Sequence, residues 1–492
     1  MKKIVIKYLL PMIVAVSTVS CNDWLSVTSS AELQAEKLFE TRAGFYEALT
    51  GVYMAMGESS VYGGYYMYSI NNYAAYPFRI VDQTYLIGDV QKHNYTHDRV
   101  KAMFASMWSS GYNVIANINI ILRELDKRRN VINSDVEYSL IKGELLALRA
   151  YLHFDIMRMF GVNDWSGENA SKLAVPYNTE YSAVVIPQVT YLETEKLLLA
   201  DLHGALECLQ EVDPIVVDLG DAFDATVNAD GYWNNRAKHM NYYAVAALAA
   251  RVYQWKNEYE TAATYAQEVI DGVFDAGLVS WVDPAAIVKE SSDDMKDWNF
   301  STEHIFSLEV TDLYSTLRPV FFSGDRTSVY IDDSFVNVIF PSTGSLAGIE
   351  DIRGTALQLK YTSLGYTLYK YYGSTSFAAE YRNRIPMSRI SEMYYIVAES
   401  LIKDGKNADA LKELDKVREH RGITSELSSE IDAAEELLKE YHREFIGEDK
   451  LFYYLKHINA QSSLSETFTL KASDLIYPYP DEEINYGRKQ EL

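Results

Sequence analysis

Apolar residues recur at three- and four-residue spacings along most of the chain, and two of these stretches also carry a helix start signal. One begins with Ser134-Asp135-Val136-Glu137 and continues with Leu140, Ile141, Leu145, Leu148, Leu152 and Ile156. The other begins with Thr190-Tyr191-Leu192-Glu193 and continues with Leu197, Leu198, Leu202, Leu206 and Leu209. Both openings are capping boxes, in which side chains satisfy the first free N–H groups of a helix. Because an apolar face at this spacing has to pack on another one, the chain is predicted to be mainly α.

The same periodicity predicts further helices over 41–57, 98–128, 239–256, 259–272, 388–404, 407–420 and 430–457. Two neighbouring pairs of these helices carry small alanines at packing positions, namely Ala262, Ala266, Ala398 and Ala408. Alanines at this spacing let antiparallel helices approach closely, as in tetratricopeptide repeats of about 34 residues. The two pairs lie far apart in the sequence, so tetratricopeptide-like pairs are predicted but a continuous solenoid is not.

Long stretches without helical period lie between the helices, at 58–97, 161–188, 212–237 and 273–387. Loops of this length are uncommon inside a compact body and are often functional. The last stretch holds short alternating segments at 328–331 and 367–371, which are predicted to be strands. The sequence therefore predicts a helical scaffold with long inserted loops.

The N-terminus has the three parts of a signal peptide. Lys2 and Lys3 precede an apolar run over 4–19 that Lys7 interrupts, and Thr18-Val19-Ser20-Cys21 closes it. The run is too short to span a bilayer, and a cysteine after the cleavage site is typical of a lipobox. Residues 1–20 are thus predicted to be removed and Cys21 to be lipidated, several acyl chains giving a firm anchor. The alternative is a secreted protein with a chance cysteine.

The formal net charge of -24 excludes some partners. Nucleic-acid binding requires a basic surface, and electrostatic docking onto anionic lipid requires one as well, so neither is predicted. The second cysteine, Cys208, follows Leu202 and Leu206 on the helical pattern and is predicted to be a small buried residue.

Several blocks, in order along the chain, resemble those of the SusD/RagB family. They are Trp108, Tyr112, Ile115 and Asn119; Ile141-Lys142-Gly143-Glu144 through Phe160-Gly161; Ala174-Val175-Pro176-Tyr177; Ile385-Pro386-Met387-Ser388-Arg389 with Glu392, Ala398-Glu399 and Val417-Arg418 through Arg421-Gly422; and Tyr477-Pro478-Tyr479-Pro480 with Glu483. Departures occur at Glu448-Asp449-Lys450-Leu451, where the family usually has Glu-Gly-x-Arg, at Tyr454, where it has aspartate, and at Tyr479. These are scaffold positions, and they weaken any transfer of ligand identity.

The resemblance implies a SusD-like body over 21–492, with an N-terminal part to about 230 and a RagB/SusD C-terminal part from about 231. It also implies four tetratricopeptide-like helix pairs and a lipid anchor on the outer membrane of a Gram-negative bacterium, with exposure at the cell surface. In nutrient uptake such a protein caps a SusC-like TonB-dependent transporter and delivers glycans or, in some members, peptides. No catalytic residue is implied.

Tyrosine is abundant, with 39 copies, and eight of them lie within 61–95. Gly63 and Gly64 break any helix there, so these rings are expected on a loop. Sugars offer C–H groups to aromatic faces and hydroxyls to polar side chains. The candidate ligand residues are Tyr62, Tyr65, Tyr66, Tyr73, Tyr76, Asn72, Arg79 and Asp82, and the resemblance adds Trp281 and Trp298 from the later insertion. The alternative is that the rings pack the loops onto the scaffold or contact the transporter.

Signatures of catalysis are lacking in the sequence. There is no G-x-S-x-G elbow, Walker loop or Rossmann fingerprint, and the pair His93 and His97 lacks the glutamate of a zinc protease. The acidic turn 291–294 with Asp297 lacks the spacing of a calcium loop, so at most incidental calcium is expected and no other cofactor or metal. Glu435 and Glu436 are interpreted as surface charge on a helix. Glycan capture is the leading hypothesis; peptide capture, a surface glycoside hydrolase and a purely structural lid are the alternatives.

Overall fold

The structure is a computed structural model that describes residues 37–80, 82, 86–182, 184–290, 296–322, 328–341, 351–354, 359–371, 383–462, 464–465 and 468–487. The predicted signal peptide, Cys21, Tyr85 and the acidic turn 291–294 lie outside the described residues. Within the described part, no helix combines the length and the apolar character needed to cross a membrane.

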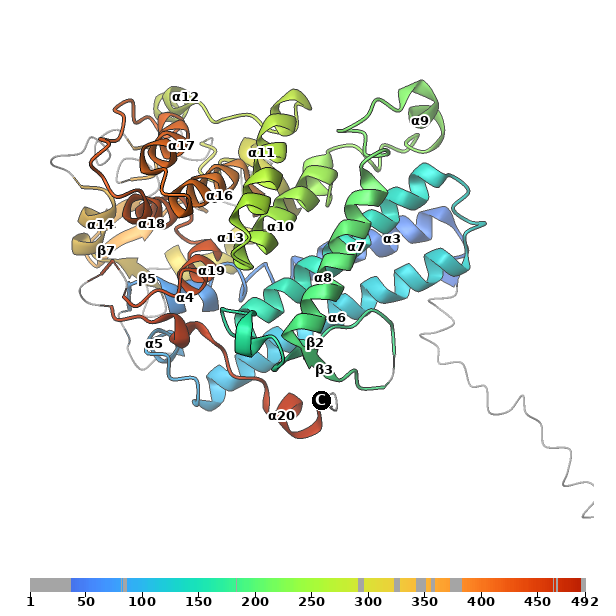
Figure 1. Cartoon of the computed structure of the whole chain (residues 1–492), viewed down its shortest axis with the longest axis horizontal. Helices are drawn as coiled ribbons and strands as arrows, with labels where there is room; N and C mark the ends of the chain where they lie inside the picture. Colours follow the sequence, from blue (N-terminus) through green and yellow to red (C-terminus); the bar gives the residue numbers. More distant parts are fainter. Residues whose placement is uncertain are drawn as a thin grey trace, which may run out of the picture.

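Helices dominate the molecule, as predicted (Figure 1). The long ones are α3 (Arg42–Met56), α6 (Asp98–Lys127), α7 (Asp135–Phe160), α8 (Tyr191–Leu209), α10 (Tyr242–Trp255), α11 (Tyr259–Asp275), α16 (Ile390–Lys403), α17 (Asn407–Glu419) and α18 (Ala433–Glu444). Shorter ones are α4 (Ile70–Ala75), α5 (Leu86–Gln91), α9 (Gly220–Thr226), α12 (Pro284–Lys289), α13 (Leu313–Leu317), α14 (Asp333–Ile339), α19 (Lys450–His457) and α20 (Asp481–Tyr486). Single turns of 3-10 or π helix lie at Gly167–Asn169, Arg236–Lys238, Ser301–Glu303, Arg318–Phe322 and Ala472–Leu475.

Strands are short and form small antiparallel sheets. The largest has the order β1-β5-β7-β6, from β1 (Phe78–Ile80), β5 (Val329–Ile331), β6 (Leu359–Thr362) and β7 (Gly365–Leu368). β2 (Leu173–Pro176) pairs with β3 (Gln188–Thr190), and β4 (His304–Glu309) pairs with β8 (Arg384–Arg389). β5 and β7 lie at or close to the two strands predicted from the sequence.

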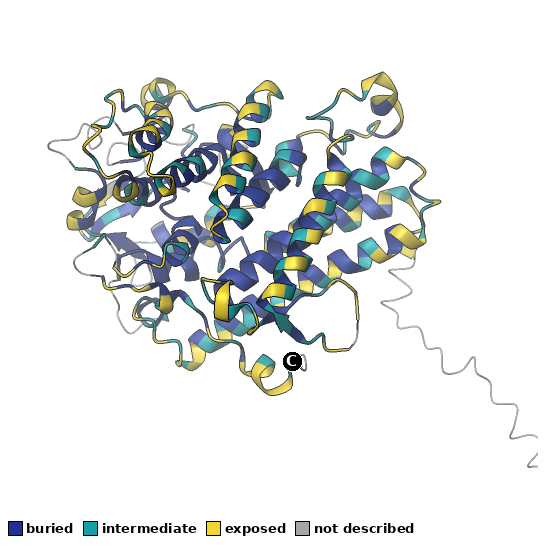
Figure 2. Ribbon diagram, in the orientation of Figure 1, coloured by how far each residue is buried: buried dark blue, intermediate teal, exposed yellow. Residues whose placement is uncertain are grey.

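The N-cap residues of α7 and α8 are the ones that the sequence predicted. Ser134 Oγ accepts the N–H of Glu137 at 3.3 Å, and Thr190 Oγ1 accepts that of Glu193 at 3.2 Å. α7 is buried on almost every side because α6, α8 and α10 pack around it, and the buried residues gather where the helices face one another (Figure 2). Cys208, which the sequence placed in the interior, is a free, half-buried thiol on α8.

The helix pairs α7/α8, α10/α11 and α16/α17 pack on one another in succession. α11 lies directly against α16, although residues 276–389 separate them in the sequence. Ala262, Ala266 and Ala398 are fully buried at these contacts, as the packing argument requires. Ala408 is exposed and Ala410 is buried in its place, so the predicted register of α17 was wrong at that position.

The predicted helix 430–457 is two helices, α18 and α19, separated by residues 445–449. Gly447 lies in this break with a φ of 74°, a left-handed conformation that glycine adopts without strain. Beyond the break, the ring of Tyr454 stacks on Tyr441 at 3.7 Å between centroids, with an interplanar angle of 2°. The tyrosine that replaces the family's usual aspartate therefore packs the two helices together.

Gly447→Ala is expected to lower the free energy of unfolding by more than the left-handed conformation alone would cost. That conformation costs alanine about 1–2 kcal/mol. The added Cβ would also lie 2.3 Å from Leu368 Cδ2, and overpacking of this kind costs about 1–3 kcal/mol more. Urea unfolding of Gly447→Ala measures the sum of the two costs. Gly405→Ala is the matched control and measures the cost of the conformation alone, since Gly405 has the same φ of 74° and open space around it. Equal losses in the two variants would show that the contact with Leu368 is relaxed at no cost.

A buried cluster of charges holds the stretch 273–387, called the insertion from here on, to the helical scaffold. Glu444, at the end of α18, accepts hydrogen bonds from Arg353 at 2.9 Å, from Arg389 at 2.6 Å and from Arg421 at 2.7 Å. Arg421 also pairs with Glu303 at 2.6 Å. Burial alone would raise the pKa of Glu444, but Arg421 and Arg389 outweigh it and hold that pKa well below its usual range.

Other carboxylates of α18 join this cluster. Glu440 accepts from Arg353 at 2.7 Å and from Arg443 at 2.6 Å. Glu436, predicted to be surface charge, is buried and accepts from Arg443 at 2.6 Å, whereas its neighbour Glu435 is exposed as predicted. The inner face of α18 is therefore charged, and its carboxylates are paired with buried arginines.

Candidate functional site

Most of the tyrosines predicted to contact ligand lie in the interior. Tyr62 and Tyr66 are on turns, as expected, and Tyr73 lies on α4; together with Tyr76 and Asn72 they are buried. A buried ring offers no face to a ligand that arrives from solvent. The interpretation of these five residues as an accessible ligand surface is therefore wrong, and the alternative that the rings pack the loop onto the scaffold describes their positions.

Their hydroxyl groups show why tyrosine rather than phenylalanine occupies these positions. Tyr62 donates to Asp155 of α7 at 2.6 Å, and Tyr66 donates to the carbonyl of Met107 in α6 at 2.8 Å. The same pattern recurs on α3, where Tyr46 donates to Glu137 at 2.6 Å and Tyr53 to Glu144 at 2.5 Å. Each hydroxyl satisfies a polar group of a neighbouring helix, so tyrosine is a structural residue here.

The remaining candidates are dispersed over the molecule. Tyr65 and Asp82 are half-buried, and Arg79 is exposed, with its Nη1 3.5 Å from the carbonyl of Leu364 in the β6–β7 turn. Trp281 stacks on His420 at 4.3 Å between centroids, and Trp298 is buried beside Phe300 and Ile352. The structure does not bring these residues together into one cavity.

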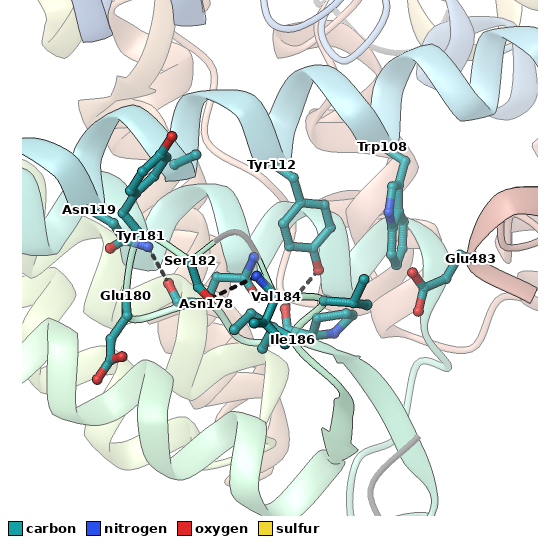
Figure 3. A pocket seen from close by; sticks show the side chains of 13 residues that line it. Trp108, Tyr112, Asn119, Asn178, Glu180, Tyr181, Ser182, Val184, Ile186 and Glu483 are labelled. Atoms are coloured by element: carbon teal, nitrogen blue, oxygen red, sulfur yellow. Dashed lines mark hydrogen bonds between the residues drawn. The ribbon is translucent and has the colours of Figure 1, made fainter. Parts of the chain in front are cut away.

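A groove of about 240 Å³ lies elsewhere, between α6 and the segment 177–187 that links β2 to β3 (Figure 3). Its inner wall is a single stripe of α6, formed by Trp108, Tyr112, Ala116 and Asn119. Spacings of four, four and three residues place these side chains on one face of a helix. Below, this cavity is called the α6 groove.

The inner wall is held in place by hydrogen bonds and by ring packing. Tyr112 donates to the carbonyl of Pro176 at 2.7 Å, and Asn119 Nδ2 donates to that of Asn178 at 2.9 Å. Trp108, 9% exposed, packs edge to face on Phe160 at 5.1 Å and on Tyr479 at 5.6 Å. The aromatic part of the wall is therefore preorganised.

The outer wall carries unusually exposed apolar and aromatic side chains. Tyr181 is 49% exposed, Val184 60% and Val185 50%, and Ile186 of the same segment also lines the groove. The guanidinium of Arg123 lies over the ring of Tyr181, 5.4 Å from its centroid. Exposed apolar groups gathered at one place with polar neighbours are typical of an interaction site.

Polar groups lie at both ends of the α6 groove. Glu180 is exposed at one end, and Glu483 of α20 lies beside Trp108 at the other, where its Oε1 accepts from Gln188 Nε2 at 2.8 Å. Asn178 Oδ1 is shielded from solvent and has no hydrogen-bond partner among the residues that the structure describes. Burial and then the charge of Glu483 raise the pKa of the Tyr112 hydroxyl well above its usual range, so this hydroxyl stays protonated.

A second hollow of about 480 Å³ continues the α6 groove towards α20 and shares Trp108, Val185 and Glu483 with it. Tyr486 and Glu482 line its far side. The combined space is within the usual range of ligand sites in proteins, which is about 300–1,000 Å³. Three distant parts of the chain, α6, the β2–β3 link and α20, thus form one concave surface.

The sequence contained these parts but did not connect them. Trp108, Tyr112, Asn119 and Glu483 were marks of the family resemblance, and 161–188 was a long loop of unknown use. Glu180, Tyr181, Ser182 and Val184 were missed. The available signal was the apolar run Ala183-Val184-Val185-Ile186 close to Tyr181, which follows the polar residues Asn178-Thr179-Glu180 of the same link. Among the described residues, no group of three or more His, Cys, Asp and Glu side chains is arranged to hold a metal ion.

Two family profiles match the sequence. Residues 23–254 match a SusD-like profile described as starch-binding and associating with the outer membrane, and residues 336–487 match the profile of the SusD family. The comparison with curated proteins gave no match.

Solved structures share the fold over nearly their whole length. A SusD superfamily protein from Bacteroides thetaiotaomicron matches 91% of this chain and 98% of its own, with a TM-score of 0.70 and 22% identity. One from Bacteroides fragilis matches 92% and 100%, with a TM-score of 0.68 and 21% identity. A SusD-like carbohydrate-binding protein from Bacteroides vulgatus matches 87% and 83%, with a TM-score of 0.61 and 17% identity. With profiles matching both halves and this fold throughout, the chain belongs to the SusD/RagB family.

Proposed function

We propose that the chain captures glycans at the cell surface and that the α6 groove is where they bind. The observation that carries this proposal is the composition of the groove, an aromatic and apolar wall with a carboxylate at each end. A sugar ring presents C–H groups to an aromatic face and hydroxyl groups to such oxygens. The family profile over 23–254, described as starch-binding, supports the same ligand class.

The cellular setting is part of the proposal. Lipidation at Cys21 would tether the chain to the outer membrane, and a SusC-like TonB-dependent transporter would receive the captured glycan. The signal-peptide pattern of residues 1–21 and the description of the matching profile as associating with the outer membrane support this setting. Binding without catalysis is proposed, because capture for transport requires release of an intact ligand.

Calorimetric titration of the chain from Asn22 with panels of glycans and peptides tests the ligand class. Tyr181→Ala is expected to weaken glycan binding about tenfold, since an aromatic contact contributes about 1.4 kcal/mol. Tyr361→Ala is the matched control, because Tyr361 is 66% exposed on β6, outside the groove, and its loss is expected to leave affinity unchanged.

The possible outcomes separate the alternatives. Binding of peptides alone would replace glycan capture by peptide capture. Glycans that are shortened after the titration would instead show a surface hydrolase. Absence of heat exchange with both panels would favour a structural lid. Glycan binding that Tyr181→Ala leaves unchanged would contradict the placement of the site in the α6 groove.

A further inference from the structure

The two neighbouring hollows lie along one helix. The α6 groove extends over α6 from Trp108 to Asn119, and the hollow beside α20, called the extension below, extends from Ala105 to Ser109. Between Ala105 and Asn119 the helix rises by about 21 Å, at about 1.5 Å per residue. A disaccharide covers only part of this length, whereas a longer linear glycan can occupy both hollows at once.

An aromatic ring lies at each end of the combined space. Tyr181 is at the Asn119 end, where the guanidinium of Arg123 lies over its ring, 5.4 Å from the centroid. Tyr486, the last residue of α20, lines the extension and is 78% exposed. Trp108 lines both hollows and therefore lies between the two tyrosines. A ligand confined to one hollow cannot contact both Tyr181 and Tyr486.

The helix surface beneath the two hollows is low. Ala105, Ser109 and Ala116 follow the same four- and three-residue spacing as Tyr112 and Asn119, which places them on one face of α6. Their side chains are small and leave space above the helix for a ligand. Trp108 is only 9% exposed, so it forms part of this floor and does not project between the hollows.

We infer that the site takes a linear oligosaccharide lengthwise along α6, with one part in the α6 groove beside Tyr181 and another part in the extension beside Tyr486. A glycan longer than a disaccharide is then held by two groups of contacts, and binding of its first part raises the effective concentration of the second. This inference rests on the proposed function and specifies the length and the placement of the ligand.

The two hollows differ in how firmly their walls are held. In the α6 groove, hydrogen bonds fix Tyr112 and Asn119, and ring packing fixes Trp108. Tyr486 is largely exposed at the end of a six-residue helix, so ordering its side chain costs a ligand more conformational entropy. A disaccharide is therefore expected to bind in the α6 groove, and the extension is expected to affect only longer glycans.

Calorimetry with glucose oligomers from starch, cellulose and laminarin, each as a disaccharide and as a hexasaccharide, tests this placement. A hexasaccharide offers about five overlapping disaccharide registers, which alone raise its apparent affinity by up to about fivefold. For the linkage that binds most tightly, the contacts in the extension are expected to add about tenfold to this gain.

Three variants separate the two hollows. Tyr486→Ala is expected to remove the added tenfold from the hexasaccharide and to leave disaccharide affinity unchanged, whereas Tyr181→Ala weakens both about tenfold. Ser109→Leu fills the extension from an exposed position of α6 and should act like Tyr486→Ala. Ile484→Ala is the matched control and should change neither affinity, because Ile484 is 56% exposed on α20 and is not among the described residues that line either hollow.

The failures are distinguishable. A hexasaccharide that gains no more than the register effect of about fivefold would overturn the lengthwise placement but leave glycan capture in place. A larger gain that both Tyr486→Ala and Ser109→Leu retain would overturn the assignment of the second group of contacts to the extension. Absence of binding by any glycan, in this set or in the wider panel, would overturn the proposed function itself.

Discussion

Glu444→Gln is expected to lower the free energy of unfolding by about 3–5 kcal/mol, the usual cost of breaking a buried ion pair by removing one partner. The substitution removes the negative charge that Arg353, Arg389 and Arg421 share, and no water can take its place, because all three guanidinium groups are buried. Glutamine retains one oxygen acceptor, but the two N–H donors of its amide would face the N–H donors of the arginines.

Urea unfolding followed by circular dichroism measures this loss. Glu435→Gln, on the exposed face of the same helix, is the matched control and should change stability by no more than about 0.5 kcal/mol. Because the cluster joins Glu303 and Arg353 of the insertion to α18, the variant should also make the insertion more sensitive to proteolysis. A change below about 1 kcal/mol would show that the buried charges are not essential to the fold.

Acid is expected to destabilise the protein in two stages. Burial lowers the pKa of His153 to about 3 and that of His442 to about 4. For Glu144, burial raises the pKa, but His239 and Arg236 outweigh it and bring the value to about 2; for Glu440, Arg353 and Arg443 do the same. In each case the folded chain binds a proton less readily than the unfolded chain, so stability is lost as the pH falls.

The pH windows follow from these values. The contribution of the two histidines is complete above their unfolded pKa of about 6.5 and is lost as the pH falls towards 4 and 3. That of the two glutamates is complete above about 4.5 and is lost towards 2, at about 3 kcal/mol each. Urea midpoints measured from neutral to acidic pH should therefore start to decline at about pH 6.5 and decline about twice as steeply just below about 4.5.

The Glu440→Gln variant provides the control for this titration. It should be less stable than the parent chain at neutral pH, and its stability should depend less on pH in the steep region, because one of the titrating carboxylates is gone. Parallel curves for the two proteins would show that Glu440 does not titrate with an unusual pKa.

The helices were predictable because their signals are local. Ser134 and Thr190 mark the starts of α7 and α8, and the apolar residues that follow each are only three or four positions apart. The break between α18 and α19 was missed because the amphipathic pattern runs through it. What separates the two helices is Gly447 in a left-handed conformation, close to Leu368 on a distant strand.

The role of the tyrosines was not predictable because their partners are distant in the sequence. Tyr62 and Asp155 are 93 residues apart, and Tyr46 and Glu137 are 91 apart. A tyrosine that satisfies a buried carboxylate and one that stacks on a sugar look alike in a single sequence. The same holds for Glu436, which was interpreted as surface charge on a helix because its partner Arg443 is identified only by the fold.

The α6 groove was hidden for a related reason. Trp108, Tyr181 and Glu483 come from three segments spread over more than half of the chain, and only the fold brings them together. The sequence marked each of these segments separately, as part of a family block or as a long loop. No local pattern indicates that one face of α6 packs against the link between β2 and β3. Ligand sites between elements are therefore harder to predict than the elements themselves.

Amide hydrogen exchange with and without a saturating glycan would show whether glycans bind in the α6 groove, because it locates the ligand without any substitution. If glycan binds in the α6 groove, exchange should be slower in the segment 178–186 and in α20, and unchanged in the buried tyrosine segment 61–76. Protection confined to the sheet β1-β5-β7-β6 or to the segment 61–76, with 178–186 unaffected, would contradict binding in the α6 groove.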